Sequence, residues 1–129
     1  MDDVNEKLSE QISDFIKLIN SAVPSFNYFY DKMLEQDKIT QDILHKLELE
    51  DVKYNERARL ATELQKVRRD RRKYKDCVEE LELIKNFALD DKNKRFINNL
   101  GQLVGAVRKV EKYHADRHYF PRVVKGVTE

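Results

Sequence analysis

Tryptophan is absent from this sequence, cysteine occurs once, proline twice and glycine three times. The single cysteine, Cys77, excludes a disulfide within the chain and is typical of proteins from reducing compartments. No run approaches the roughly 20 apolar residues that a membrane-spanning helix needs. The acidic first residues, MDDVNEKL, include no apolar core of signal-peptide length. We therefore expect a soluble, cytoplasmic protein without membrane partners.

The scarcity of helix breakers leaves long stretches of the chain free to form helices. Charged residues make up 38% of the 129 and apolar residues 40%, a balance typical of helical bundles and coiled coils. The sequence predicts an all-α protein of three to four helices with one long central helix. We expect an elongated helical bundle or a coiled-coil-like hairpin, forming a single domain over 1–129.

The long central helix is predicted over 55–89, which contains neither glycine nor proline and many strong helix formers. Its apolar residues recur at alternating spacings of four and three, the pattern of helices that pack side by side. This seam, a core or a dimer interface, consists of Leu60, Leu64, Val67, Tyr74, Val78 and Leu81. Arg71 interrupts the seam, so its guanidinium must find a carboxylate or reach solvent. Because a lone chain would expose the seam over a large area, we expect a homodimer.

The remaining helices are predicted over 1–23, 25–54 and 91–116. Pro24 should end the first of them, because proline disfavours helical backbone in the residue before it. Thr40 and Asn55 are both plausible N-caps, so residues 25–89 form one helix or several. We favour a break near residues 51–55.

The last predicted helix has a wide apolar face and begins after Asp90 and Asp91, which suit a turn and an N-cap. Gly101 and Gly105 lie one turn apart in it, and each costs about 1 kcal/mol relative to alanine in a helix interior. We therefore expect another helix to approach this part of the chain closely. A short basic tail, 117–129, follows.

The formal net charge of +1 hides an asymmetry between the two halves of the chain. Residues 1–65 carry 8 Lys and Arg against 14 Asp and Glu, whereas residues 66–129 carry 17 against 10. The most basic segment is 66–75, KVRRDRRKYK. Pairing between the acidic and basic halves is the simplest explanation of the asymmetry.

The basic segment is also a candidate binding surface, because clustered Lys and Arg neutralise phosphates or match acidic protein surfaces. Arg68, Arg69 and Arg72 should lie on the outer side of the helix when Val67 and Arg71 face inward. With basic residues of the last helix and the tail, the candidate partner-binding residues are Arg68, Arg69, Arg72, Lys73, Lys75, Arg108, Lys109, Lys112, Arg117 and Arg122.

A second candidate surface is the aromatic turn SFNYFYDKML, which holds Phe26, Tyr28, Phe29 and Tyr30. Such rings can form a platform for a base or for a partner's side chain. The alternative is that they close the end of the bundle where Pro24 turns the chain.

Motifs for catalysis, metal binding or cofactors are weak. His114 and His118 are spaced for one helix face, but Asp116 lies on another side, no third ligand is evident, and the neighbouring arginines disfavour a divalent cation. Cys77 lies beside a seam residue, which indicates a buried thiol more than a nucleophile. We expect a non-enzymatic protein without a cofactor.

The segments RRKYKDCVEELELIKNF, INNLGQLVGAVRKVEKY and RHYFPRV resemble small α-helical proteins of unassigned function from phages and prophages of Gram-positive bacteria. The resemblance implies an intracellular phage accessory protein, of the kind that inhibits or modulates a host machine, including bacterial immune complexes. The leading hypothesis is therefore a binding protein that inhibits or modulates a host protein or nucleoprotein complex in the host cytoplasm. The alternative is a nucleic-acid-binding accessory protein that uses residues 66–75, and the third is a small metal-dependent hydrolase or nuclease.

Overall fold

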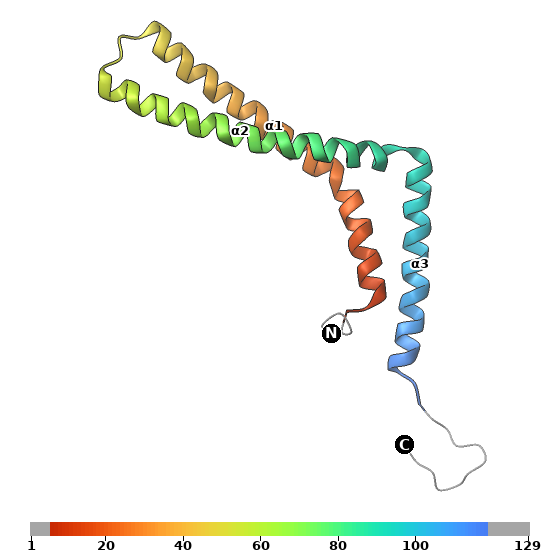
Figure 1. Cartoon of the computed structure of the whole chain (residues 1–129). Coiled ribbons are helices and arrows are strands. Elements are labelled where there is room, and N and C mark those ends of the chain that lie inside the picture. Colours follow the sequence, from red (N-terminus) through yellow and green to blue (C-terminus); the bar gives the residue numbers. More distant parts are fainter. Residues whose placement is uncertain (1–5, 119–129) are drawn as a thin grey trace, which may run out of the picture. The chain divides into compact units, whose positions relative to one another are not determined.

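The computed structural model describes residues 6–118. Three α-helices make up nearly all of this part, namely α1 (Leu8–Leu49), α2 (Tyr54–Leu89) and α3 (Asp91–Ala115) (Figure 1). Residues 6–118 contain no β-strand. The predicted all-α class is confirmed, and the helix predicted over 55–89 is α2 to within one residue.

The chain divides into two compact units, and α1 and α3 contribute residues to both. The hairpin unit comprises Leu18–Asn93. The terminal unit combines Met1–Lys17 with Lys94–Glu129, of which residues 6–17 and 94–118 are described.

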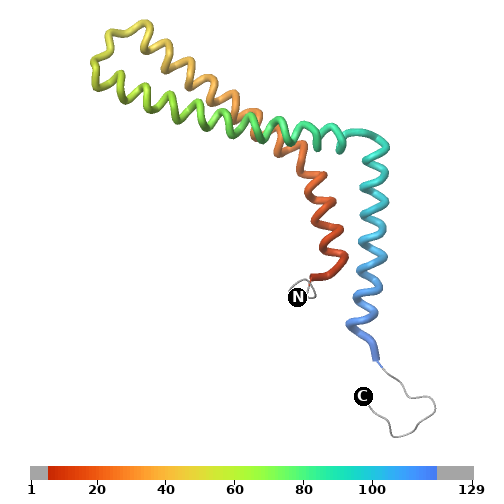
Figure 2. Tube along the Cα trace, in the orientation of Figure 1, coloured from red at the N-terminus to blue at the C-terminus, as the bar shows by residue number. Residues whose placement is uncertain are grey.

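In the hairpin unit, α1 and α2 run antiparallel and side by side from the closed end (Figures 1 and 2). Residues 50–53 form the closed end, which confirms the predicted break near residues 51–55. Lys53 is the N-cap of α2, with extended backbone (φ −68°, ψ 159°) and no side-chain cap. The predicted N-caps were wrong: Asn55 already lies inside α2, and Thr40 lies inside α1, where its hydroxyl donates to the Gln36 carbonyl at 2.9 Å.

The core of the hairpin unit lies next to this closed end. It is formed by Ile43 of α1, Val52 of the turn, and Leu60 and Val67 of α2, with three partly buried residues packed against them: Ile39, Leu47 and Leu64. Full burial of an aliphatic side chain stabilises a fold by roughly 1.5–3 kcal/mol. Because Val52 turns inward and is only 7% exposed, the turn itself belongs to the core.

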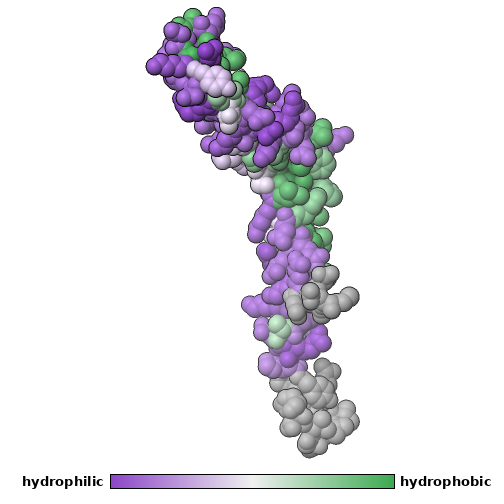
Figure 3. All heavy atoms as spheres, turned by 60° about the vertical axis from the view of Figure 1, so that its left-hand side comes forward, coloured by the Kyte–Doolittle hydropathy of each residue, from purple (hydrophilic) through white to green (hydrophobic). Residues whose placement is uncertain are grey.

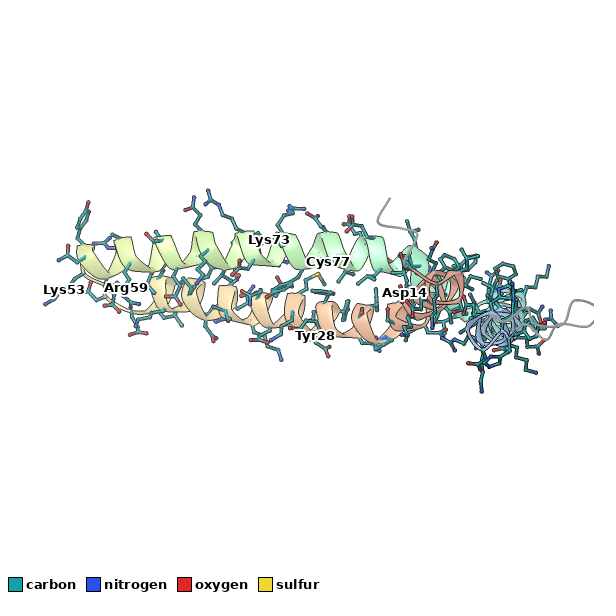
Figure 4. All side chains as sticks on the ribbon, turned by 90° about the horizontal axis from the view of Figure 1, so that it is seen from below. Asp14, Tyr28, Lys53, Arg59, Lys73 and Cys77 are labelled. Carbon is teal, nitrogen blue, oxygen red and sulfur yellow. The ribbon has the colours of Figure 1, made fainter. Side chains whose placement is uncertain are left out.

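The seam predicted on the long helix is confirmed as a packing surface. Leu60, Val67 and Val78 are buried, and Leu64, Tyr74 and Leu81 are half-buried. The partner of this surface is α1 of the same chain, and Cys77 lies on the same side of α2 (Figure 4). The seam is therefore covered without a second chain, which removes the reason for which the sequence predicted a homodimer.

Pro24 does not end a helix, contrary to the prediction, because α1 continues through it from Leu8 to Leu49. A proline inside a helix removes one backbone hydrogen bond and costs about 3 kcal/mol or more. Ile19 and Ala22, on the turns before Pro24, are 8% and 1% exposed, while the proline itself is exposed. Burial on one side of the helix therefore outweighs the local preference for a break, and helical backbone continues through Pro24.

Polar contacts tie the two helices of the hairpin unit together along its length. At the closed end, Lys46 Nζ lies 2.9 Å from Glu56 Oε1. This hydrogen bond raises the pKa of Lys46 and lowers the pKa of Glu56. Further along, Lys85 Nζ lies 4.0 Å from the centre of the Phe26 ring, a cation–π distance.

In the terminal unit, the end of α3 is fastened to the start of α1 through Ser9 and Glu111. The Ser9 hydroxyl donates to Glu111 Oε1 at 2.6 Å, and the Ser9 backbone N–H donates to Oε2 at 3.2 Å. Ser9 is only 1% exposed. The first N–H groups of a helix have no partner within it, so the Glu111 carboxylate acts as a cap supplied from α3.

The connection between α2 and α3 agrees with the sequence prediction. Asp90 Oδ1 accepts a hydrogen bond from the Lys92 backbone N–H at 2.9 Å, which is the geometry of an N-cap. Asn93 Nδ2 donates to the Phe87 carbonyl at 3.0 Å and so satisfies one of the last carbonyls of α2. The predicted end of the last helix near Asp116 is also confirmed, because α3 ends at Ala115.

Gly101 and Gly105 do not mark a close helix approach. A Cβ atom built on either residue would meet no atom within 4 Å, so the space beside both is open. The expectation of a helix packed against them was wrong, and the cost of the two glycines stays without a structural explanation. The predicted first-helix residues 1–5 and the tail residues 119–129 lie outside the described part of the chain.

Hydrophilic residues cover most of the visible face of the hairpin unit, and hydrophobic residues show at its closed end (Figure 3). Within residues 6–118, no helix combines the length and apolar character that crossing a membrane would require.

Candidate functional site

The basic segment, residues 66–75, is divided by the hairpin into an inward and an outward part. Arg71 Nε lies 2.7 Å from Asp37 Oδ1 of α1, and Arg68 Nη1 lies 3.4 Å from the same oxygen. The Arg71 side chain is 21% exposed and that of Arg68 is 48% exposed. The carboxylate required for Arg71 is therefore Asp37, and Arg68, which we expected on the outer side, reaches the same partner.

The outward part consists of Lys66, Arg69, Arg72 and Lys73, which we call the outer cation stripe. All four residues are exposed, and none forms an ion pair with another described residue. Arg69 and Lys73 are four residues apart, a spacing at which like charges on a helix repel each other by a few tenths of a kcal/mol. Lys75, at the end of the basic segment, is half-buried, and its Nζ lies 4.0 Å from Glu79 Oε1.

Internal neutralisation, the simplest explanation of the charge asymmetry, therefore accounts for only part of the basic segment. Asp37 of the acidic half meets the two arginines that face α1. The outer cation stripe stays exposed to solvent, and repulsion between its charges costs a small amount of free energy. Binding of an anionic partner would offset that repulsion.

The basic residues predicted on the last helix belong to the terminal unit. Arg108 and Lys112 line a cavity of about 350 Å³ next to Glu111, together with Lys7, Ser9, Glu10 and Ala115. Lys109 is exposed, and the Arg117 guanidinium lies 5.8 Å from the Tyr113 ring centre. Arg122 lies outside the described residues. A single stripe that joins these residues to the basic segment stays a prediction, because the two groups lie in different units.

Glu111 lies in this cavity and accepts two hydrogen bonds from Ser9. The hydrogen bond donated by the Ser9 hydroxyl holds the pKa of Glu111 below its ordinary value, and the nearby Lys7 and Arg108 act in the same direction. Glu111 is therefore a carboxylate at neutral pH and occupies the positive surroundings that Lys7, Arg108 and Lys112 create.

The aromatic turn is divided in the same way as the basic segment. Phe26 and Phe29 are half-buried against α2, where the rings of Phe29 and Tyr74 lie 6.2 Å apart. Tyr28 and Tyr30 are 56% and 41% exposed. Tyr28 lies on the side of α1 turned away from α2 (Figure 4). The phenylalanines thus pack within the hairpin unit, and the two tyrosines are the residues of this turn that are accessible to a partner.

The candidate metal ligands and the cysteine singled out in the sequence lie apart in the part of the chain that the structure describes. No group of three or more His, Cys, Asp or Glu within residues 6–118 is placed to hold a metal ion. His114 and His118 are exposed, and Cys77 is half-buried in the hairpin. His45 lies on the exposed side of α1, beside a shallow depression.

Several contacts that organise this surface had no signal in the sequence. Asp37 is one of many acidic residues in the first half of the chain, and only the register between α1 and α2 selects it as the partner of Arg71. The same holds for the contact between Phe26 and Lys85. Aligning the heptad patterns of α1 and α2 at every antiparallel register would have ranked such contacts.

Comparisons with models of protein families, with curated proteins and with solved structures find no match to this chain.

Proposed function

We propose that this protein is a non-enzymatic helical binding protein that engages an acidic surface of a macromolecular partner through the outer cation stripe. The observation that carries the proposal is the division of the basic segment. Asp37 neutralises the inward arginines, whereas Lys66, Arg69, Arg72 and Lys73 stand exposed without an ion pair among the described residues. A rigid helix that presents unneutralised charge gives both orientation and rapid association with a complementary surface.

The partner class that we favour is a protein or nucleoprotein complex of a bacterial host, and the binding would inhibit or modulate it. The resemblance to phage accessory proteins supports this choice, including the case in which the target is a bacterial defence system. Arg and Tyr are enriched among the residues that dominate protein interfaces. The chain offers exposed residues of both kinds, with Tyr28 and Tyr30 on α1 and the stripe on α2. We place this activity in the host cytoplasm.

A nucleic acid is the second candidate, because an exposed run of cations also matches a phosphate backbone. The specific observation in its favour is that the outward side of residues 66–73 carries no carboxylate, since Asp70, the acidic residue of this run, is half-buried. The dependence of binding on salt concentration distinguishes the two partner classes. Phosphate binding weakens steeply with ionic strength, whereas a protein interface with an apolar centre weakens less.

The test is retention of partners from a Gram-positive host lysate by the wild-type chain and by the variant Arg69→Glu/Arg72→Glu/Lys73→Glu. We expect the variant to keep its helicity and to lose the partner, because like-charge contact at an interface costs several kcal/mol. The matched control is Lys17→Glu/Lys38→Glu/Lys94→Glu, which changes three exposed lysines outside the stripe by the same total charge. This control should retain the partner.

Nuclease treatment and a salt series on the same samples assign the partner class. A partner that survives nuclease and about 0.3 M salt is a protein, and one that is lost under both conditions is a nucleic acid. Equal retention by the wild-type chain and the stripe variant would exclude the outer cation stripe as the binding surface.

A further inference from the structure

The side of α2 turned away from α1 carries a second seam with the same spacing as the buried one. Starting at Thr62, exposed residues recur at alternating steps of four and three up to Phe87. This outer seam consists of Thr62, Lys66, Arg69, Lys73, Asp76, Glu80, Leu83 and Phe87. All eight residues are exposed, and the seam lies about half a turn round the helix from Val67 and Val78. A sustained pattern of this kind is how one helix presents itself to another.

The charges along the outer seam reverse sign at its midpoint. Lys66, Arg69 and Lys73 precede the midpoint, and Asp76 and Glu80 follow it. None of the five forms an ion pair with another described residue, although i,i+3 and i,i+4 partners are available along the helix. The seam therefore offers two adjacent blocks of opposite charge, both open to solvent.

Such a seam is complementary to itself in an antiparallel arrangement. A two-fold axis between residues 74 and 75 brings Lys73 opposite Asp76 of a second copy and Arg69 opposite Glu80. The same axis brings Leu83 opposite Lys66, whose aliphatic stem can cover an apolar side chain while its ammonium stays in water. Leu83 is 75% exposed in the single chain, so it gains cover in this arrangement.

We propose that the protein forms an antiparallel homodimer through the outer seam of α2, and that the charge reversal selects a second copy of this chain as the occupant. The contact extends over residues 62–87, or about 37 Å of helix, with charged residues at its centre. An interface of one helix pair with a charged centre lies at the low end of stable interface sizes. The dimer is therefore weak, in the micromolar range, and it dissociates as salt rises because the pairs are exposed.

The dimer uses Arg69 and Lys73, which also belong to the outer cation stripe. A second copy and the proposed macromolecular partner therefore compete for the same two cations. Dimerisation places them beside carboxylates, and dissociation frees them.

Two charge-reversal variants test the dimer by sedimentation velocity at about 0.05 M salt. Arg69→Glu/Lys73→Glu makes all four central charges of the seam acidic and leaves Lys66 as the remaining cation, and Asp76→Lys/Glu80→Lys makes the charged part of the seam wholly basic. Each variant alone should associate at least about 100-fold more weakly than the wild-type chain, because like charges then face each other. An equimolar mixture of the two should form a heterodimer at least as tight as the wild-type dimer.

Controls separate the seam from general charge effects. Lys38→Glu/Asp42→Lys reverses one exposed cation and one exposed carboxylate on α1 and should leave the dimer unchanged. If a double variant loses helicity, the single changes Arg69→Glu and Glu80→Lys carry the same test with half the charge. A wild-type chain that stays monomeric at high micromolar concentration would overturn the proposal, as would a mixture that fails to associate.

The outcome for the dimer is distinguishable from the outcome for the proposed function. Asp76→Lys/Glu80→Lys keeps every residue of the outer cation stripe, so it should retain the partner although it cannot dimerise. If it retains the partner and also dimerises normally, the dimer proposal fails alone. If the wild-type chain dimerises as described but retains no partner, the proposed function fails alone.

Discussion

Each unit of this chain buries aliphatic residues, which include Ile97 and Val104 of α3 in the terminal unit, but the two units differ in their polar contacts. The hairpin unit has a cluster of buried aliphatic residues at its closed end and a series of polar and aromatic contacts farther along. In the terminal unit, the hydrogen bonds between its two segments come from one carboxylate, Glu111, on one serine. The comparison teaches that stability in a chain so rich in charge is local, and that different residues should control the two units.

The largest effect is expected from Leu60→Ala in the apolar end of the hairpin unit. Leu60 is 4% exposed and belongs to the central cluster, so its truncation removes buried apolar area and leaves a cavity. We expect a loss of about 2–4 kcal/mol in the free energy of unfolding, measured by urea denaturation. Leu49→Ala, at a leucine that is 77% exposed, is the matched control and should change it by less than about 0.5 kcal/mol. Equal effects at the two leucines would show that the closed end is not the core.

A smaller effect is expected from Asp37→Asn in the polar part of the hairpin unit. The change keeps the size of the side chain but removes the charge that faces Arg71, which is the less exposed of the two arginines. Breaking a fully buried pair costs about 3–5 kcal/mol, and the partial exposure of this pair reduces the expected loss to about 1–2 kcal/mol. The measurement is thermal unfolding at low and at high salt. Asp42→Asn, at an exposed carboxylate of the same helix, should leave the melting temperature unchanged.

The smallest effect, and the one that isolates the terminal unit, is expected on acidification. The pKa of Glu111 is lowered in the folded state, so its contribution is fully present above the ordinary value of 4.5 and is lost as the pH falls through the lower folded value. Glu111→Gln should mimic this loss at pH 7 and speed the hydrogen exchange of the Ser9 amide by about 3–10-fold. Amides around Leu60 should be unaffected. Glu10→Gln, at an exposed carboxylate of the same cavity, is the control. Equal exchange at Ser9 in all three proteins would contradict the capping role of Glu111.

Sequence periodicity predicted the faces of α2 well, because burial repeats with the helical turn regardless of the partner. Leu60, Val67 and Val78 are all buried as that pattern requires. Local rules failed at Pro24, where burial of Ile19 and Ala22 outweighs the backbone preference of a single residue. Local rules also could not predict which residues of the basic segment face α1, because the orientation of Arg68 depends on Asp37, a carboxylate 31 residues away in the chain.

The pair formed by Asp37 and Arg71 also works against slippage. A hairpin with a repeating seam can in principle slide by one heptad and still bury apolar residues, since each repeat resembles the next. Sliding by seven residues would move Asp37 opposite Leu64 or Val78 and leave two charges without partners, which is a costly state. This charged contact within a repetitive apolar seam therefore helps to fix the register between α1 and α2. Among the alignments open to a folding chain, it favours the one in which Arg68 and Arg71 share the Asp37 carboxylate.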